Sequence, residues 1–202
     1  MTPLSTLLSF FPAFVMLTAA ASFLWICIAP GFASVGTLVF SLYGLPLLAY
    51  RIHRYFYPIE EGISYLIGEK YSPWWGSHQI QAVYIAFPAL ETLLRLIPGA
   101  FSAWLRLWGA RVGQNVYWNP GLAIADRGLI EIGDRSIIGH QVGIYSHVIK
   151  PKKENLMLYV KKVKIGSNVF LGSASQMGPG VVIENGVFVP VTTDLFPNKK
   201  MS

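Results

Sequence analysis

His147 is the side chain of this sequence best placed to move a proton. The sequence contains four histidines, and imidazole changes charge near neutral pH, so it can take a proton from an attacking hydroxyl or amine. His147 ends the segment Tyr145-Ser146-His147, and residues 148–162 directly after it interrupt a regular pattern. Functional groups often lie where a loop leaves a rigid scaffold. This break favours His147 over His140, which follows Gly139 at an expected corner, where structural or solvent-facing side chains are common.

Positive charge follows His147. The segment up to residue 164 carries lysines at positions 150, 152, 153, 161, 162 and 164. These lysines can meet the phosphates of a nucleotide-type cofactor or of anionic lipid, and a solvated loop without a ligand is the alternative. The chain has a net charge of +6, but no basic–aromatic recognition motif accompanies that charge, so nucleic acid is not an expected partner.

The pattern that the lysine segment interrupts is an apolar residue at every sixth position. The series is Val112, Trp118, Ile124, Ile132, Ile138, Ile144, Ile165, Leu171, Met177, Ile183 and Val189, and glycine follows six of these eleven. A six-residue period fits neither an α-helix nor a β-strand and predicts a β-solenoid with three faces per coil. The recurring side chains fill its core, and glycine permits the tight corners.

The repeat resumes 21 residues after Ile144, at Ile165. We therefore expect a solenoid domain over residues 112–197 with an excursion loop at 148–162 and a short tail at 198–202.

The N-terminal region is apolar and uncharged. Residues 1–50 contain no charged side chain, and Arg51 is the first. About 20 apolar residues span a bilayer, so we expect two transmembrane helices near 6–29 and 32–50, turning at Pro30-Gly31. A cleaved signal peptide is the alternative, but the stretch is too long and lacks a basic start.

Residues 1–54 are thus expected to form a two-helix membrane anchor. Arg51, His53 and Arg54 follow it, and no lysine or arginine precedes it. The positive-inside rule then places residue 51 onward, with the N-terminus, in the cytoplasm, so we expect an inner-membrane protein with a cytoplasmic catalytic domain.

Residues 55–111 are expected to form an aromatic, interfacial connector. Residues 89–111 are typical of two short amphipathic helices broken at Pro98-Gly99, with Glu91, Arg95 and Arg106 on the polar side. Such helices can lie in the membrane interface. Packing against the open first coil of the solenoid is the alternative.

Residues 112–197 resemble the hexapeptide-repeat acyltransferases, which have a left-handed parallel β-helix. The resemblance is closest to the galactoside, maltose, xenobiotic and colanic-acid-type O-acetyltransferases. It rests on Ile132-Gly133-Asp134, then Tyr145-Ser146-His147, the lysine-bearing loop, and the restart Val163-Lys164-Ile165-Gly166-Ser167-Asn168-Val169. The N-terminal half resembles, more distantly, the membrane-embedded modules of polylysine-type peptide synthetases.

The resemblance implies that His147 is the catalytic base and that a coenzyme A thioester, acetyl-CoA, is the co-substrate, with no metal. The residues that it places at the cofactor are Lys164, Phe170, Gly172, Ser173 and Ala174, with Phe170 replacing the family's tryptophan and one amide of 172–174 facing the thioester carbonyl.

At the acceptor, the resemblance implies Asn119, Asp126 and Tyr145. The family's acceptor-binding asparagine aligns with Gly121, two positions from Asn119. The resemblance also implies a homotrimer with active sites between neighbouring chains.

The expected function is a membrane-anchored acyltransferase that moves an acetyl group from coenzyme A to a hydroxyl of a membrane-associated glycan or lipid-linked acceptor. An amine N-acyltransferase or peptide-synthetase-like module is one alternative. A catalytically silent trimeric membrane scaffold is another, and the expectation of a compressed last coil at 188–194 favours it. A zinc lyase like the γ-class carbonic anhydrases would need three histidines, two of them five positions apart, whereas His140 and His147 are seven apart.

Overall fold

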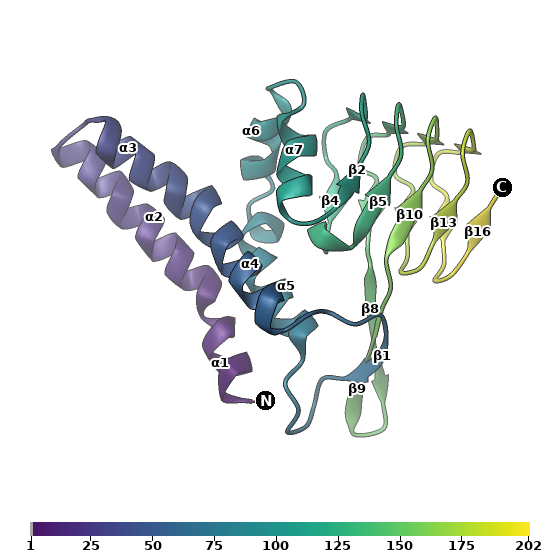
Figure 1. Ribbon diagram of the computed structural model, residues 1–202, viewed down its shortest axis with the longest axis horizontal. Helices are drawn as coiled ribbons and strands as arrows, with labels where there is room; N and C mark the ends of the chain where they lie inside the picture. The colour runs from purple at the N-terminus through teal and green to yellow at the C-terminus, as the bar shows by residue number, and fades with distance from the viewer. Residues whose placement is uncertain (1) are drawn as a thin grey trace. The chain divides into compact units, whose positions relative to one another are not determined.

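The computed structural model describes residues 2–202 (Figure 1). They divide into two compact units. A helical unit contains residues 2–59 and Leu66–Ala86, and a β unit contains Glu60–Tyr65 with Phe87–Ser202. The expected connector at 55–111 is therefore not one segment: part of it belongs to each unit.

The helical unit is built from two apolar helical stretches and one further helix. Its elements are α1 (Pro3–Ser9), α2 (Phe11–Ile28), α3 (Phe32–Val39), the π-helical turn η1 (Phe40–Gly44), α4 (Leu45–Phe56) and α5 (Pro73–Ala86). The stretches Pro3–Ile28 and Phe32–Phe56 are long and apolar enough to cross a membrane, a test of length and composition alone. The chain turns between them at residues 29–31, as the sequence predicts, and Ser34 Oγ accepts the Gly31 N–H there at 3.1 Å.

Helix α5 packs on both stretches, which the sequence did not predict. Tyr84 on α5 donates its hydroxyl hydrogen bond to the carbonyl of Leu42, inside the π-helical turn, at 2.7 Å. Tyr71, just before α5, bonds the His53 imidazole through its hydroxyl. Burial, with a smaller contribution from Tyr57, raises the pKa of Tyr71 to about 12. Residues 66–86 thus complete the helical unit.

The β unit is a parallel β-helix with three walls (Figure 1). The first wall contains β2 (Arg111–Val112), β5 (Ile130–Ile132), β10 (Val163–Ile165), β13 (Val182–Ile183) and β16 (Lys200–Met201). The second contains β3 (Tyr117–Trp118), β6 (Ile137–Ile138), β11 (Phe170–Leu171) and β14 (Phe188–Val189). The third contains β4 (Ala123–Ile124), β7 (Gly143–Ile144), β12 (Gln176–Met177) and β15 (Asp194–Leu195). The predicted solenoid with three faces per coil is confirmed.

The predicted six-residue series forms the core of this β-helix. Ten of its eleven members are buried, and only Trp118 is partly exposed. Equivalent residues stack in register from coil to coil, with Ile132 paired to Val112 on one side and to Ile165 on the other.

The glycines after these residues are required by the stacking. A Cβ on Gly133 would lie 2.5 Å from the Ser167 amide nitrogen and 2.6 Å from the Gly166 carbonyl carbon. Because backbone atoms of the next coil cannot move away cheaply, a side chain at this corner would force the coils apart.

The end of the chain differs from the expectation. The coil at 188–194 is not compressed, and 198–202 is not a tail, because β16 pairs in parallel with β13. Leu195 is buried in the core. The spacing from Val189 to Leu195 to Met201 is again six, so the repeat continues beyond the last position that we had included.

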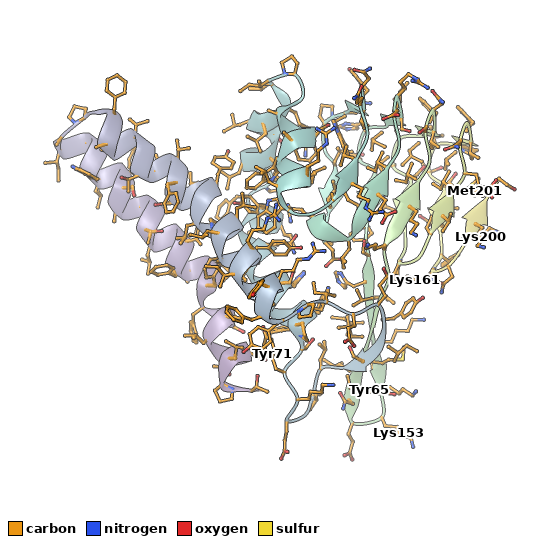
Figure 2. The ribbon with its side chains drawn as sticks, viewed as in Figure 1. Tyr65, Tyr71, Lys153, Lys161, Lys200 and Met201 are labelled. Carbon is orange, nitrogen blue, oxygen red and sulfur yellow. The ribbon has the colours of Figure 1, made fainter. Side chains whose placement is uncertain are left out.

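The excursion at 148–162 is a β-hairpin rather than a loop. Strand β8 (His147–Lys152) pairs antiparallel with β9 (Asn155–Val160), and β1 (Gly62–Tyr65) adds a third strand from far upstream. Figure 2 shows Lys153 at the tip of this hairpin and Lys161 at its base. Lys150 and Lys152 thus lie on an ordered strand of this sheet, and Lys153 lies in its turn.

Two helices pack against the first coil. They are α6 (Ala89–Arg95) and α7 (Ala100–Leu107), and they are separated at Gly99, whose φ of 78° lies in the left-handed region. This confirms the predicted break at Pro98-Gly99. Ser102 accepts a hydrogen bond from the Trp118 indole at 2.8 Å, and Arg106 donates to the Val112 carbonyl at 2.8 Å. Of the two alternatives for these helices, packing on the solenoid is observed.

The prediction that Glu91, Arg95 and Arg106 lie on one polar face of these helices is partly wrong. Glu91 is 4% exposed, because it is the partner of a buried arginine described below. Arg106 points back to the first coil rather than to a headgroup.

Candidate active site

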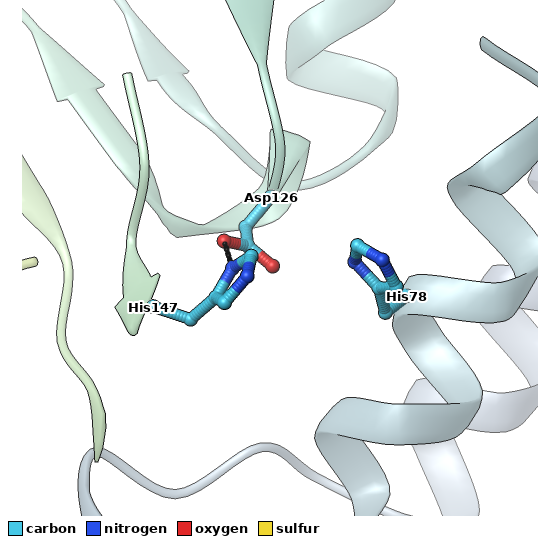
Figure 3. A group of neighbouring side chains, drawn as sticks. All are labelled: His78, Asp126 and His147. Carbon is cyan, nitrogen blue, oxygen red and sulfur yellow. Dashed lines mark hydrogen bonds and ion pairs between the residues drawn. The ribbon is translucent and has the colours of Figure 1, made fainter. Parts of the chain in front are cut away.

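His147 begins strand β8 at the point where the chain leaves the β-helix. Its Nδ1 atom lies 2.7 Å from Oδ2 of Asp126, as the dashed line in Figure 3 marks. The Asp126 side chain is 3% exposed and the His147 side chain 17% exposed. A buried carboxylate therefore holds an imidazole that remains partly accessible.

Coil stacking brings these two residues together although they are 21 positions apart. Strands β4 and β7 pair in parallel with Ile124 opposite Ile144. Asp126 lies two residues beyond the end of β4 and His147 three residues beyond the end of β7, so the two arrive at the same edge of neighbouring coils.

A short turn after Asp126 fixes the arrangement from the other side. It is the 3₁₀ helix η2 (Arg127–Leu129), in which the Leu129 amide donates to the Asp126 carbonyl at 3.0 Å. The hydroxyl of fully buried Ser146 donates to the Leu129 carbonyl at 2.8 Å. Both His147 and its preceding residue are therefore bonded to the same turn.

The geometry sets the tautomer of His147. An ionised Asp126 only accepts hydrogen bonds, so the Nδ1 atom of His147 must carry the hydrogen. The lone pair of the neutral ring is then on Nε2, which makes Nε2 the basic atom. If Nε2 takes a proton, the neighbouring carboxylate stabilises the resulting imidazolium.

The structure brings only some of the predicted site residues to His147. Asp126 contacts it directly. Tyr145 lies two residues before it, beside Gln176 over Gly143. Asn119 is at a different corner of the coil, between the second and third walls, where its side-chain amide donates to the Ile138 carbonyl at 2.9 Å.

The residues predicted for the cofactor also lie away from His147 within one chain. Gly172, Ser173 and Ala174 occupy the corner between the second and third walls, and the Ala174 amide donates to the His140 carbonyl at 2.7 Å. The Gly172 amide donates to the Val189 carbonyl at 2.8 Å. Within residues 2–202, the Ser173 amide donates no hydrogen bond to a backbone carbonyl.

The remaining two predicted cofactor residues face outward from the walls. Lys164 Nζ lies 4.0 Å from Glu131 on the first wall. Phe170 stacks on Phe188 on the second wall, with ring centroids 5.0 Å apart and planes nearly parallel.

Sequence reasoning missed two residues beside the site, Glu91 and Arg127. Arg127 is 1% exposed and forms an ion pair with Glu91. One signal was present: the spacing from Ile124 to Ile132 is eight rather than six, which places two extra residues in this coil just where Asp126 and Arg127 occur.

The chain is similar in sequence and in fold to known acetyltransferases. No protein-family model matches the chain. The galactoside O-acetyltransferase of Escherichia coli (strain K12) is 34% identical to it over 94 residues, or 43% of this chain and 46% of that protein. The chain thus spans about half the length of the curated relative that it matches. This sequence similarity confirms the resemblance to hexapeptide-repeat O-acetyltransferases of the galactoside type.

Solved structures of two such enzymes are also similar. A hexapeptide-repeat acetyltransferase from Vibrio cholerae O1 biovar eltor, complexed with acetyl coenzyme A, has a TM-score of 0.45 and 18% identity, covering 66% of this chain and 87% of that chain. A galactoside acetyltransferase in complex with coenzyme A has a TM-score of 0.39 and 18% identity, covering 55% and 74%.

Proposed function

We propose that this chain is an acetyl-CoA-dependent O-acyltransferase in which His147 is the general base. The observation that carries the proposal is the His147–Asp126 contact at 2.7 Å on a hexapeptide β-helix. The 34% identity to a galactoside O-acetyltransferase supports acetyl transfer as the reaction.

In the proposed reaction, Nε2 of His147 removes the proton from an acceptor hydroxyl as its oxygen attacks the thioester carbonyl of acetyl-CoA. The carbonyl oxygen becomes negative in the tetrahedral intermediate and needs an N–H donor, for which the Ser173 amide is our candidate. Collapse of the intermediate breaks the C–S bond. The imidazolium returns its proton to the thiolate of coenzyme A, which restores the neutral ring.

We further propose that the β-helix is left-handed, as in the acyltransferases that the chain resembles. We also propose that the enzyme is a homotrimer, because the parts of the site lie at different corners of one chain. A neighbouring chain would bring its Ser173 corner, and with it Phe170 on the adjoining second wall, to His147. An outward apolar ladder on the second wall supports such packing. Its rungs, aligned by the strand register, are Tyr117, Ile137, Phe170 and Phe188. Tyr117 and Phe188 are more than half exposed, and exposed apolar ladders of this kind favour a partner surface.

The membrane part of the proposal rests on the two apolar stretches. Only 17% of each is buried within the chain, whereas a core helix of a soluble domain is mostly buried. A bilayer would cover the rest. The basic residues after the second stretch favour a cytoplasmic β-helix at the inner membrane. An acceptor held at the membrane, such as a lipid-linked glycan, would explain the anchor.

The test is acetyl transfer by the detergent-purified full chain. We expect radiolabelled acetyl-CoA and a total membrane lipid extract to give a labelled lipid or lipid-linked glycan. Mild alkali should release the label as acetate, because it hydrolyses an ester. Label that resists mild alkali would indicate the amine acyltransferase. If the protein neither binds nor consumes acetyl-CoA, the proposal is contradicted and the silent scaffold is favoured.

The proposed topology predicts which positions a membrane-impermeant maleimide reaches in intact spheroplasts. Cys27 is the only cysteine, so it is first replaced by serine. A cysteine at Phe32, which is fully exposed after the helical turn, is expected to react from outside. A cysteine at Lys153, on the hairpin tip, is expected to react only after the membrane is permeabilised. Reaction of position 153 in intact spheroplasts would contradict the cytoplasmic placement.

A further inference from the structure

A buried carboxylate ties three segments of the β unit together. Glu91 in the first turn of α6 accepts the Trp104 indole hydrogen bond from α7 at 3.0 Å. It also accepts two bonds from Arg127 of η2, from Nε to Oε1 at 2.6 Å and from Nη2 to Oε2 at 2.9 Å. Glu91 is 4% exposed and Arg127 is 1% exposed. The contact is therefore a two-point ion pair out of contact with water.

Such an ion pair fixes the positions of its two side chains more than it stabilises the fold. Removing two charges from water costs several kcal/mol per ion, about as much as their attraction returns, so apolar side chains of similar volume often serve stability equally well. Arginine does not lose its proton in proteins. Arg127 must therefore keep its carboxylate partner or leave its site, and its planar guanidinium permits only a narrow range of orientations.

This ion pair lies next in the chain to the carboxylate that bonds His147. Arg127 is the residue directly after Asp126, and both belong to the short turn that ends at Leu129. Two groups of this turn bond the segment at residues 146–147: the Asp126 carboxylate bonds His147, and the Leu129 carbonyl accepts from Ser146. A third group of the turn, the Arg127 guanidinium, forms the ion pair with Glu91.

We propose that the Glu91–Arg127 ion pair is a positioning device through which helices α6 and α7 hold the Asp126–His147 pair in its reactive geometry. The inference rests on the proposed function for the role of His147. It gives the two helices a part in catalysis beyond covering the first coil. Glu91 and Arg127 touch no reacting atom and act only through Asp126.

Arg95 adds to the charge near this pair. It lies one turn after Glu91 on α6, with its guanidinium 4.5 Å from the centre of the Phe101 ring. Burial lowers its pKa, the Glu91 carboxylate opposes that shift, and the charge of Arg127 adds to it. The Glu91 carboxylate therefore acts electrostatically on two neighbouring guanidinium groups.

The test compares Glu91→Gln with a double variant, Glu91→Met with Arg127→Met, which keeps the volume but removes both charges. For each we expect kcat for acetyl transfer to fall roughly 10- to 100-fold, because small misplacements of a catalytic pair have effects of this size. The KM for acetyl-CoA should change little. Arg111→Gln is the matched control, because it breaks a surface ion pair with Glu131 and is expected to leave kcat unchanged.

A second measurement does not depend on activity. Nitrogen-15 NMR of labelled histidine reports which ring nitrogen of neutral His147 carries the hydrogen, with His147→Ala identifying the signal. We expect Nδ1–H in the wild type and in Arg111→Gln, and a mixture of both tautomers in the Glu91 variants.

The double variant separates positioning from folding. If it melts at the wild-type temperature and still has a reduced kcat and mixed tautomers, the inference is supported. If it has wild-type kcat and tautomer, the pair is only structural and the inference is overturned, even if Glu91→Gln fails to fold. If wild-type protein transfers no acetyl group, the proposed function fails, and the tautomer measurement still decides whether Glu91 positions His147.

Discussion

Replacing His147 with alanine is expected to lower kcat for acetyl transfer by a factor on the order of 10² to 10⁴, the usual contribution of general base catalysis. Without the imidazole, the acceptor hydroxyl has to lose its proton to water while it attacks a neutral thioester. Binding of acetyl-CoA should persist, because the residues proposed for the cofactor lie at another corner of the coil. Steady-state rates and equilibrium binding of coenzyme A measure the two effects separately.

His140→Ala is the matched control for this variant. His140 is exposed at the preceding corner of the same coil, and its backbone carbonyl accepts a hydrogen bond from the Ala174 amide. We expect near wild-type kcat after its replacement. Equal losses in the two variants would remove the basis for choosing His147, and unchanged activity in His147→Ala would refute its assignment as the base.

Asp126→Asn is expected to have the second largest effect, a fall in kcat of at least about 100-fold. An asparagine side chain can donate a hydrogen bond to Nδ1, which favours the tautomer with hydrogen on Nε2. In the serine protease triad the corresponding change lowers kcat by about 10⁴. Because the substitution alters one atom of a buried group, the fold should survive, and far-UV circular dichroism should match that of the wild type.

The exposed Asp194→Asn, on strand β15, controls for a general effect of losing one negative charge. Its kcat should remain at the wild-type value. The prediction for Asp126 concerns kcat and not acceptor binding, although the family resemblance suggested an acceptor contact. A selective rise in the KM of the acceptor, with kcat unchanged, would restore that earlier interpretation.

The prediction of the candidate site from sequence reached His147 but not its surroundings. His147 was found because an insertion directly follows it, which is a local feature of the sequence. Asp126 was singled out only through a resemblance and was given a different role, since its distance to His147 depends on the stacking of β4 against β7. Glu91 was placed on a polar helix face, because helical periodicity cannot reveal that an arginine 36 residues later will bury it.

The fold was predicted best where its signal is periodic. The six-residue series predicted the solenoid and its core, but it was ended at Val189 because residues 188–194 were interpreted as a compressed last coil, although Leu195 and Met201 continue it. Strand β1 could not be predicted, because four residues carry little pattern and pair with β9 about 95 positions away.

By itself, the sequence determined the features that depend on near neighbours: a β-helix with its apolar core, two uncharged stretches of membrane-spanning length, helices broken at Gly99, and an interruption after His147. The tertiary structure alone decided which groups meet. It placed the Asp126 carboxylate on Nδ1 of His147 and the Glu91 carboxylate on Arg127. The physical reason is that each coil stacks on the next, so contacts between coils depend on backbone register across many residues. The six-residue repeat, in contrast, is determined by neighbouring residues within each unit of six.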